Sequence, residues 1–252
     1  MVSLFPIPNI PLIAPNADLA AILVEAMDAG GQRLQEGDVL LLAQKIVSKA
    51  EGCFVRLDEV TPSARALELA AVTGKDAREI EVILWDTAQV VRTRPGLLIV
   101  EHRNGYICAN AGLDRSNVSQ DEGETVLRLP PNPDASAVAI RNRIAALTGR
   151  RPPVLIIDSH NRPWRIGVMG ATIGLSGLKP ILSLVGRPDL FGRLLRHTEV
   201  NLADQLASAA NLLMGQADEA CPAVIARGVA YAPDETATAR EILRPVERDL
   251  FR

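Results

Sequence analysis

Two segments of the chain carry an aspartate directly after an apolar run, where a side chain can serve as a metal ligand. The first is CANAGLDRSN (108–117), which delivers Asp114, Arg115, Ser116 and Asn117 together after small residues. Its oxygen-rich set with one carboxylate suits a hard cation such as Mg²⁺ or Mn²⁺. An Asx-type turn, in which Asp114 and Asn117 bond their own backbone, explains the same residues equally well.

The second segment is IIDSHNRPWR (156–165), in which Asp158 and Ser159 follow an apolar strand. P-loop enzymes hold a divalent ion against phosphates with a strand-end Asp and a hydroxyl, although the GxxxxGKS/T motif is absent here. Arg162 and Arg165 could neutralise a phosphoryl group or a substrate carboxylate. The alternative is a helix N-cap followed by surface arginines. We favour the functional interpretation, because two arginines, a Trp and a carboxylate are an unusual set for a plain loop.

Two further segments could contact a nucleotide. Lys45 and Lys49 follow the apolar run DVLLLA (38–43) and could reach phosphate oxygens as point charges. Since charged clusters usually face water, this pattern alone favours a solvated turn with surface lysines. The segment LLMGQADE (212–219) could wrap a nucleotide or offer an oxygen ligand, but its spacing favours a helix C-cap with an acidic turn.

Several function classes are disfavoured by composition. The net charge is −3, which gives no basic footprint for nucleic acid. The three cysteines are far apart and the histidines form no HExxH motif, so neither a disulfide framework nor a zinc hydrolase is expected. No apolar run approaches the roughly 20 residues of a membrane helix. The proline-rich N-terminus is no signal peptide. We therefore expect a cytoplasmic protein.

Apolar patterns predict the elements that position these residues. Helices are expected at 18–28, from Pro62 to Gly74, at 77–84, from Asp134 to Gly149, from Leu202 to Gly215, and from Asp234 onward. The apolar face of the helix from Asp134 is predicted to consist of Ala137, Ile140, Ile144 and Leu147. That of the helix from Leu202 is predicted to consist of Leu202, Leu206, Ala209 and Leu213. Strands are expected at 38–43, 96–100, 105–109, 125–129, 153–157 and 222–226.

The predicted elements do not alternate strictly, so the fold class is mixed α/β (α+β) with mixed or antiparallel sheets. Repeats and low-complexity linkers are absent. Residues 1–252 are expected to form a single domain with room for two subdomains. The surplus of strands also leaves room for a core shared between two subunits, which composition does not show.

Taken in order, six segments resemble the coenzyme F420-0:L-glutamate ligase family, also called F420-0 γ-glutamyl ligases. The resemblance spans roughly Phe5 to Gly228 and includes Pro11-Leu12-Ile13. The six segments are GDVLLLAQKIVSKAEG from Gly37, ANAGLDRSNV from Ala109, LPPNPDASA from Leu129, DSHNRPWRIG from Asp158, GRPDLFGR from Gly186 and LADQLASAANLLMGQ from Leu202.

The resemblance implies an enzyme that uses GTP to add L-glutamate to the deazaflavin F420-0, often followed by further γ-linked glutamates. It also implies Mg²⁺ or Mn²⁺, two per site, a monovalent cation such as K⁺, and an intertwined homodimer. The C-terminal reductase-like domain of some bacterial relatives is not expected. The metal ligands carried over are Asp114, Asp158, Ser159 and Gln216. The nucleotide contacts carried over are Ile10, Pro11, Leu12, Ile13, Gln44, Lys45, Lys49, Asn117, Met214, Gly215, Gln216, Ala217 and Asp218.

We expect Asp114, Asp158, Arg162 and Arg165 to act in catalysis. The sequence departs from the family pattern at two places. His160-Asn161 stands where we expect an aromatic residue or Asn followed by Gly. Gln216 replaces the Glu of some relatives and is a weaker metal ligand. Two alternatives stay open at this point: a metal-dependent phosphatase or nucleotide hydrolase, and a non-catalytic module that binds the deazaflavin.

Overall fold

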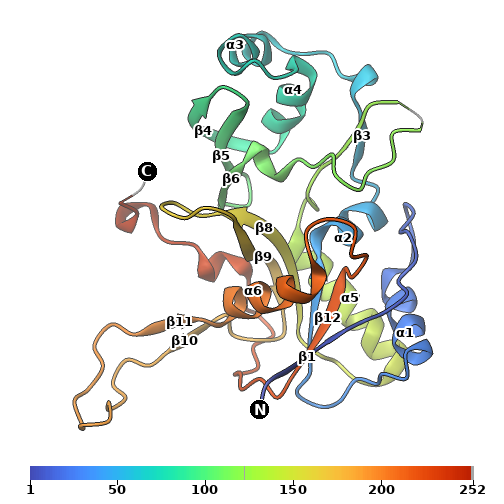
Figure 1. Ribbon diagram of the computed structural model, residues 1–252. Coiled ribbons are helices and arrows are strands. Elements are labelled where there is room, and N and C mark those ends of the chain that lie inside the picture. The colour runs from blue at the N-terminus through green and yellow to red at the C-terminus, as the bar shows by residue number, and fades with distance from the viewer. Residues whose placement is uncertain (122, 251–252) are drawn as a thin grey trace.

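A five-stranded sheet forms the centre of the molecule (Figure 1). The computed structural model describes residues 1–121 and 123–250. The strand order is β1-β12-β2-β8-β9, and only the β2–β8 pair is parallel. This mixed sheet confirms the predicted fold class. The strands are β1 (Ser3–Pro6), β2 (Val39–Ala43), β8 (Val154–Asn161), β9 (Val168–Ser176) and β12 (Ala223–Arg227).

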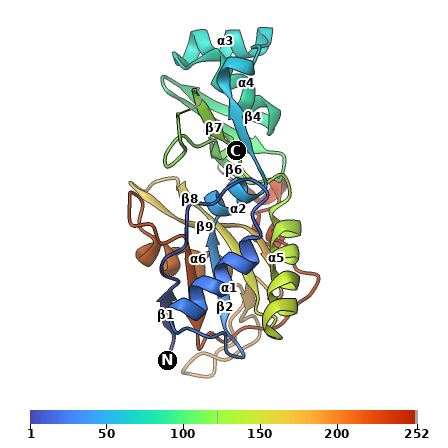
Figure 2. The same ribbon diagram turned by 90° about the vertical axis from the view of Figure 1, so that its right-hand side faces the viewer.

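Helices cover both faces of this sheet (Figure 2). Successive strand side chains point to opposite faces, so Leu40 and Leu42 of β2 pack with α1 (Leu19–Ala29) and α5 (Pro133–Thr148). Val39 and Leu41 pack on the other face with α6 (Leu202–Met214). A strand buried on both faces is apolar throughout, which explains why the run DVLLLA was visible in the sequence.

A smaller lobe, defined here as residues 53–129, stands at one end of the sheet (Figure 1). It contains an antiparallel three-stranded sheet and the β3–β7 pair. Its elements are β3 (Phe54–Arg56), α3 (Ala64–Thr73), α4 (Ala77–Trp85), β4 (Thr87–Arg94), β5 (Leu97–His102), β6 (Ile107–Ala109) and β7 (Thr125–Leu127).

A two-stranded arm projects from the opposite end (Figure 1). It consists of β10 (Ile181–Ser183) paired antiparallel with β11 (Glu199–Asn201). The segment between these strands exposes apolar side chains, among them Leu190 at 98% and Phe191 at 95% of their full accessible surface. No helix of the described residues is long and apolar enough to cross a membrane.

Several predicted boundaries were wrong for local reasons. The third helix, α3, begins at Ala64 because Ser63 is its N-cap, so Pro62 lies outside it. Asn132 caps α5, whereas Asp134 accepts the backbone N–H groups of Leu175 and Ala239. The polar strand β4 had no counterpart in the prediction. Within residues 234–250, the C-terminal segment contains the 3₁₀ turns Ala239–Ile242 and Val246–Arg248 in place of the expected helix.

The buried face of α6 also differs from the predicted apolar face. It consists of Ala203, Leu206, Ala207, Ala210 and Met214, whereas Leu213 is partly exposed. In α5, likewise, Leu147 is exposed although the predicted apolar face included it. Small residues allow α6 to approach β9 closely: Ser208 Oγ donates to the Gly170 carbonyl oxygen at 3.0 Å.

We predict that Gly170→Ala destabilises the protein by about 2 kcal/mol, since its methyl group would overlap the backbone of α6 at Ala207. Gly37→Ala is the comparison variant, because it meets open space at φ +81° and costs only the backbone strain of about 1 kcal/mol. Urea unfolding measures both. Equal losses in the two variants would contradict tight packing at Gly170.

Candidate functional site

A cavity of about 420 Å³ lies at the edge of the sheet where β2 ends and its parallel pairing with β8 stops. Parallel strands bring their carboxyl ends to one edge, which is where open sheets bind ligands. The structure brings every residue of the predicted nucleotide set to this cavity, together with Asp158 and Ser159. The walls come from residues 10–13, the start of α2 (Gln44–Ala50), Asn117, the end of β8 and residues 214–222.

The lysine segment is a helix, α2, where the sequence pattern favoured a solvated turn. Lys45 and Lys49 lie one turn apart on it, so both face the segment 114–117. The Nζ atom of Lys45 is 2.8 Å from Asp114 Oδ2, and that of Lys49 donates to the Asn117 carbonyl oxygen at 2.6 Å. Burial, and then the charge of Lys45, lower the pKa of Lys49. Both ammonium groups are thus held at one wall of the cavity.

The segment 110–117 turns sharply before it reaches α2. Asn110, Ala111 and Asn117 all have positive φ, and a side chain at Gly112 would overlap Leu129. Asp114 Oδ1 accepts the Ser116 N–H and hydroxyl, each at 2.8 Å. The Asx-type turn is therefore present, and the second carboxylate oxygen still faces Lys45.

Asn117 ties this segment to the turn after α6. Its Nδ2 donates to the Ala217 carbonyl oxygen at 3.0 Å. Gly215 ends α6 with φ +69°, and Glu219 folds back so that its carboxylate accepts the Ala217 N–H at 2.8 Å. Glu219, the last residue of the predicted segment 212–219, lines the cavity as well, and so does Asn211, which no sequence pattern singled out.

Asp158 and Ser159 lie within β8, which continues to Asn161 beyond the predicted strand end. Asp158 Oδ2 is 3.0 Å from Nε2 of His160, two residues along on the same strand face. Ser159 Oγ accepts from Nδ2 of Asn211 at 3.2 Å. In the sequence, His160 stood out only as a departure from the family pattern, whereas its two-residue spacing from Asp158 is the signal for their contact.

Three predicted catalytic residues do not line the cavity. Arg162 and Arg165 lie in the turn between β8 and β9, and Arg162 Nη1 donates to the Asn161 carbonyl oxygen at 3.1 Å. Asp114 reaches the cavity wall only through Lys45. Their catalytic roles remain predictions.

The oxygen ligands available at this cavity suit a metal ion that binds together with phosphates. Within residues 1–121 and 123–250, no three His, Cys, Asp or Glu side chains form a preformed metal cluster. Mg²⁺ commonly takes one or two carboxylates and completes its shell with substrate phosphates and water. Asp158, Ser159 and, once released by Lys45, Asp114 fit that description.

A second cavity, of about 410 Å³, lies between the start of α5, β9 and residues 235–243. The Thr172 hydroxyl in its wall has no hydrogen-bond partner among the described residues. None of the residues that resemble the family's nucleotide or metal contacts belongs to it.

Comparison with known proteins agrees with the resemblance of the six sequence segments described above. The family model described as F420-0:Gamma-glutamyl ligase matches residues 8–228. Three relatives named coenzyme F420:L-glutamate ligase match most or all of the chain. The one from Methanothermobacter thermautotrophicus is 42% identical over 100% of this chain and 99% of its own length. The one from Methanopyrus kandleri is 45% identical over 98% and 96%, and the one from Methanocaldococcus jannaschii is 43% identical over 87% and 86%. The chain belongs to the F420-0:gamma-glutamyl ligase family.

Proposed function

We propose that this protein joins L-glutamate to coenzyme F420-0 and uses GTP to activate the acceptor carboxylate. The relatives' shared name, coenzyme F420:L-glutamate ligase, supports the ligase class and the substrates. One structural observation supports the nucleotide: Gln44, Lys45, Lys49 and the turn 214–218 line one cavity beside Asp158.

An acyl phosphate is the intermediate that this chemistry requires, because a carboxylate does not condense with an amine in water without activation. In the first step, the acceptor carboxylate attacks the γ-phosphorus and GDP leaves. In the second, the glutamate amine attacks the acyl carbon, inorganic phosphate leaves and the amine loses a proton. Further γ-linked glutamates would be added by the same two steps. The protein contributes chiefly position and charge neutralisation.

Each charged group then has a role in this proposal. Lys45 and Lys49 bind phosphate oxygens as point charges. Asp114, Asp158 and Ser159 hold Mg²⁺ or Mn²⁺, with Gln216 as a ligand of a second ion and K⁺ as an assisting cation. The bound divalent ion supplies neutralisation of the charge that develops on the phosphates. Arg162 and Arg165 would approach the acceptor only after a movement of the β8–β9 turn.

The arm supports a proposal about assembly. Leu190, Phe191 and Leu194 are exposed on a segment that leaves the body of the subunit, and exposed apolar patches commonly mark protein interfaces. We propose that two copies form an intertwined homodimer in which this arm packs on the partner.

Asp158→Asn keeps the size of the side chain and removes its charge, so we predict near-normal stability and a loss of at least about 100-fold in ligation rate. Mass spectrometry of F420-0 incubated with GTP, Mn²⁺ and glutamate measures the product. Phosphate release that requires neither F420-0 nor glutamate would favour a nucleotide hydrolase instead. Deazaflavin binding without any GTP consumption would favour a binding module. A folded variant with full activity would refute the metal assignment.

Lys45→Met should have opposite effects on the affinities for Mn²⁺ and for GDP. Without the ammonium group, Asp114 is free to bind a cation, so nucleotide-free protein should bind Mn²⁺ more tightly. The affinity for GDP should fall roughly 10- to 100-fold, because a charge-assisted contact contributes about 1.5–3 kcal/mol. Calorimetric titration measures both, with the exposed Lys179→Met as control. A parallel fall in both affinities would contradict an exchange of partners at Asp114.

A further inference from the structure

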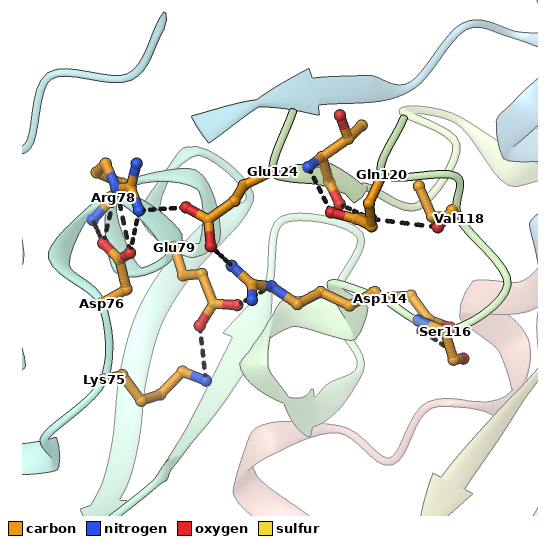
Figure 3. A network of polar contacts seen from close by, with 11 residues as sticks. Lys75, Asp76, Arg78, Glu79, Asp114, Ser116, Val118, Gln120 and Glu124 are labelled. Atoms are coloured by element: carbon orange, nitrogen blue, oxygen red, sulfur yellow. Dashed lines mark hydrogen bonds and ion pairs between the residues drawn. The ribbon is translucent and has the colours of Figure 1, made fainter. Parts of the chain in front are cut away.

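The side chain of Arg115 points away from the nucleotide cavity, although its two neighbours in sequence contact a residue of the cavity wall. Asp114 and Ser116 both meet Lys45. Arg115 instead places its Nε 2.6 Å from a carboxylate oxygen of Glu79, near the start of α4. Figure 3 shows Glu79 on the α4 side of this network and Ser116 on the other.

Glu79 is well placed to act as a fixed anchor. Its side chain is only 14% exposed, and its second oxygen lies 3.1 Å from Lys75 Nζ. An ion pair with an immobilised and partly buried partner constrains geometry more than a pair of free surface side chains does. Arg115 therefore connects the turn 114–117 to a rigid helix of the small lobe.

The far end of the same loop is fastened to the same helix. Glu124 lies 2.6 Å from Arg78 of α4 and 3.9 Å from Arg115. Gln120 closes the loop on itself, since its amide oxygen accepts the Thr125 N–H and its amide nitrogen donates to the Thr125 carbonyl oxygen, each at 2.9 Å. These contacts are drawn in Figure 3.

We propose that Arg115 is a positioning residue, whose ion pair with Glu79 holds the Asp114 carboxylate against Lys45 and the Asn117 amide at the nucleotide cavity. The segment 110–117 benefits from such support because Asn110, Ala111 and Asn117 have positive φ, which for Ala111 is a strained conformation that surrounding contacts must hold. The inference rests on the proposed nucleotide and metal site. It adds that the affinities for the nucleotide and the metal ion depend on the Arg115–Glu79 ion pair, which lies on the opposite side of the loop.

The double-mutant cycle of Arg115→Met and Glu79→Gln tests this role. Each single variant should weaken GDP binding and Mn²⁺ binding roughly tenfold, as is typical when a supporting contact of a metal ligand is lost. The double variant should lose no more than either single one, since both remove the same contact. Calorimetry measures GDP affinity, and the Mn²⁺ electron paramagnetic resonance spectrum reports the ion in the presence of GDP.

Arg65→Met is the matched control, because Arg65 pairs with Glu68 on α3 of the same lobe and contacts no part of the loop. It should bind both ligands like the wild type. The melting temperatures of all variants show whether weaker binding merely follows weaker folding.

Three outcomes would overturn the proposal. A change of less than twofold in both the GDP and the Mn²⁺ affinity of Arg115→Met would show that the contact is dispensable. A loss of GDP affinity in Arg115→Met that Glu79→Gln does not reproduce would indicate that Arg115 binds the phosphates directly. A fall in ligand affinity that is proportional to the fall in melting temperature would make the role of Arg115 purely structural. Wild-type protein that binds no GDP would instead contradict the proposed function on which the inference rests.

Discussion

Lys45 connects the two parts of the molecule that carry the charged residues of the site. It belongs to α2, which begins where the buried strand β2 ends, and it contacts Asp114 on the small lobe at 2.8 Å. Lys49, one turn further, contacts the Asn117 carbonyl oxygen of the same segment. This joint between α2 and the segment 114–117 sets the position of the Asp114 carboxylate, of the Asx-type turn and of Asn117.

Two ammonium groups, those of Lys45 and Lys49, meet only one carboxylate at this joint, that of Asp114, because Lys49 contacts a backbone carbonyl oxygen. This excess of positive charge suits an exchange of partners when an anion binds. A lysine near a carboxylate is neutralised, yet the same ammonium group is a good partner for phosphate. Asp114 would then be released to a divalent cation at the moment when the phosphates arrive. Burial, and then the charge of Lys45, lower the pKa of Lys49. Under the proposed function, the nucleotide would supply the metal ligands that the protein lacks, since Mg²⁺ commonly takes one or two carboxylates together with substrate phosphates.

The sequence predicted three of the five strands of the central sheet, β2, β8 and β12, because these are continuous apolar runs. It did not predict β9, whose sequence is rich in glycine. It missed β4, whose polar residues resemble a loop, and it shifted the buried face of α6, because that face depends on alanines packing against β9. The helix α2 was missed because it has seven residues and no side-chain N-cap. The family resemblance pointed to many of the residues that line the cavity, but not to Asn211. The Lys45–Asp114 and Arg115–Glu79 pairs join residues that are 69 and 36 positions apart, since only the folded chain brings them together.

A crystal structure of the protein with GDP and Mn²⁺ tests the central claim most directly. The account predicts that the phosphates contact Lys45 and Lys49, and that oxygens of Asp114 and Asp158 lie within roughly 2.0–2.3 Å of bound metal. Phosphates bound outside this cavity, or an Asp114 that keeps its contact with Lys45 while metal and nucleotide are bound, would contradict it.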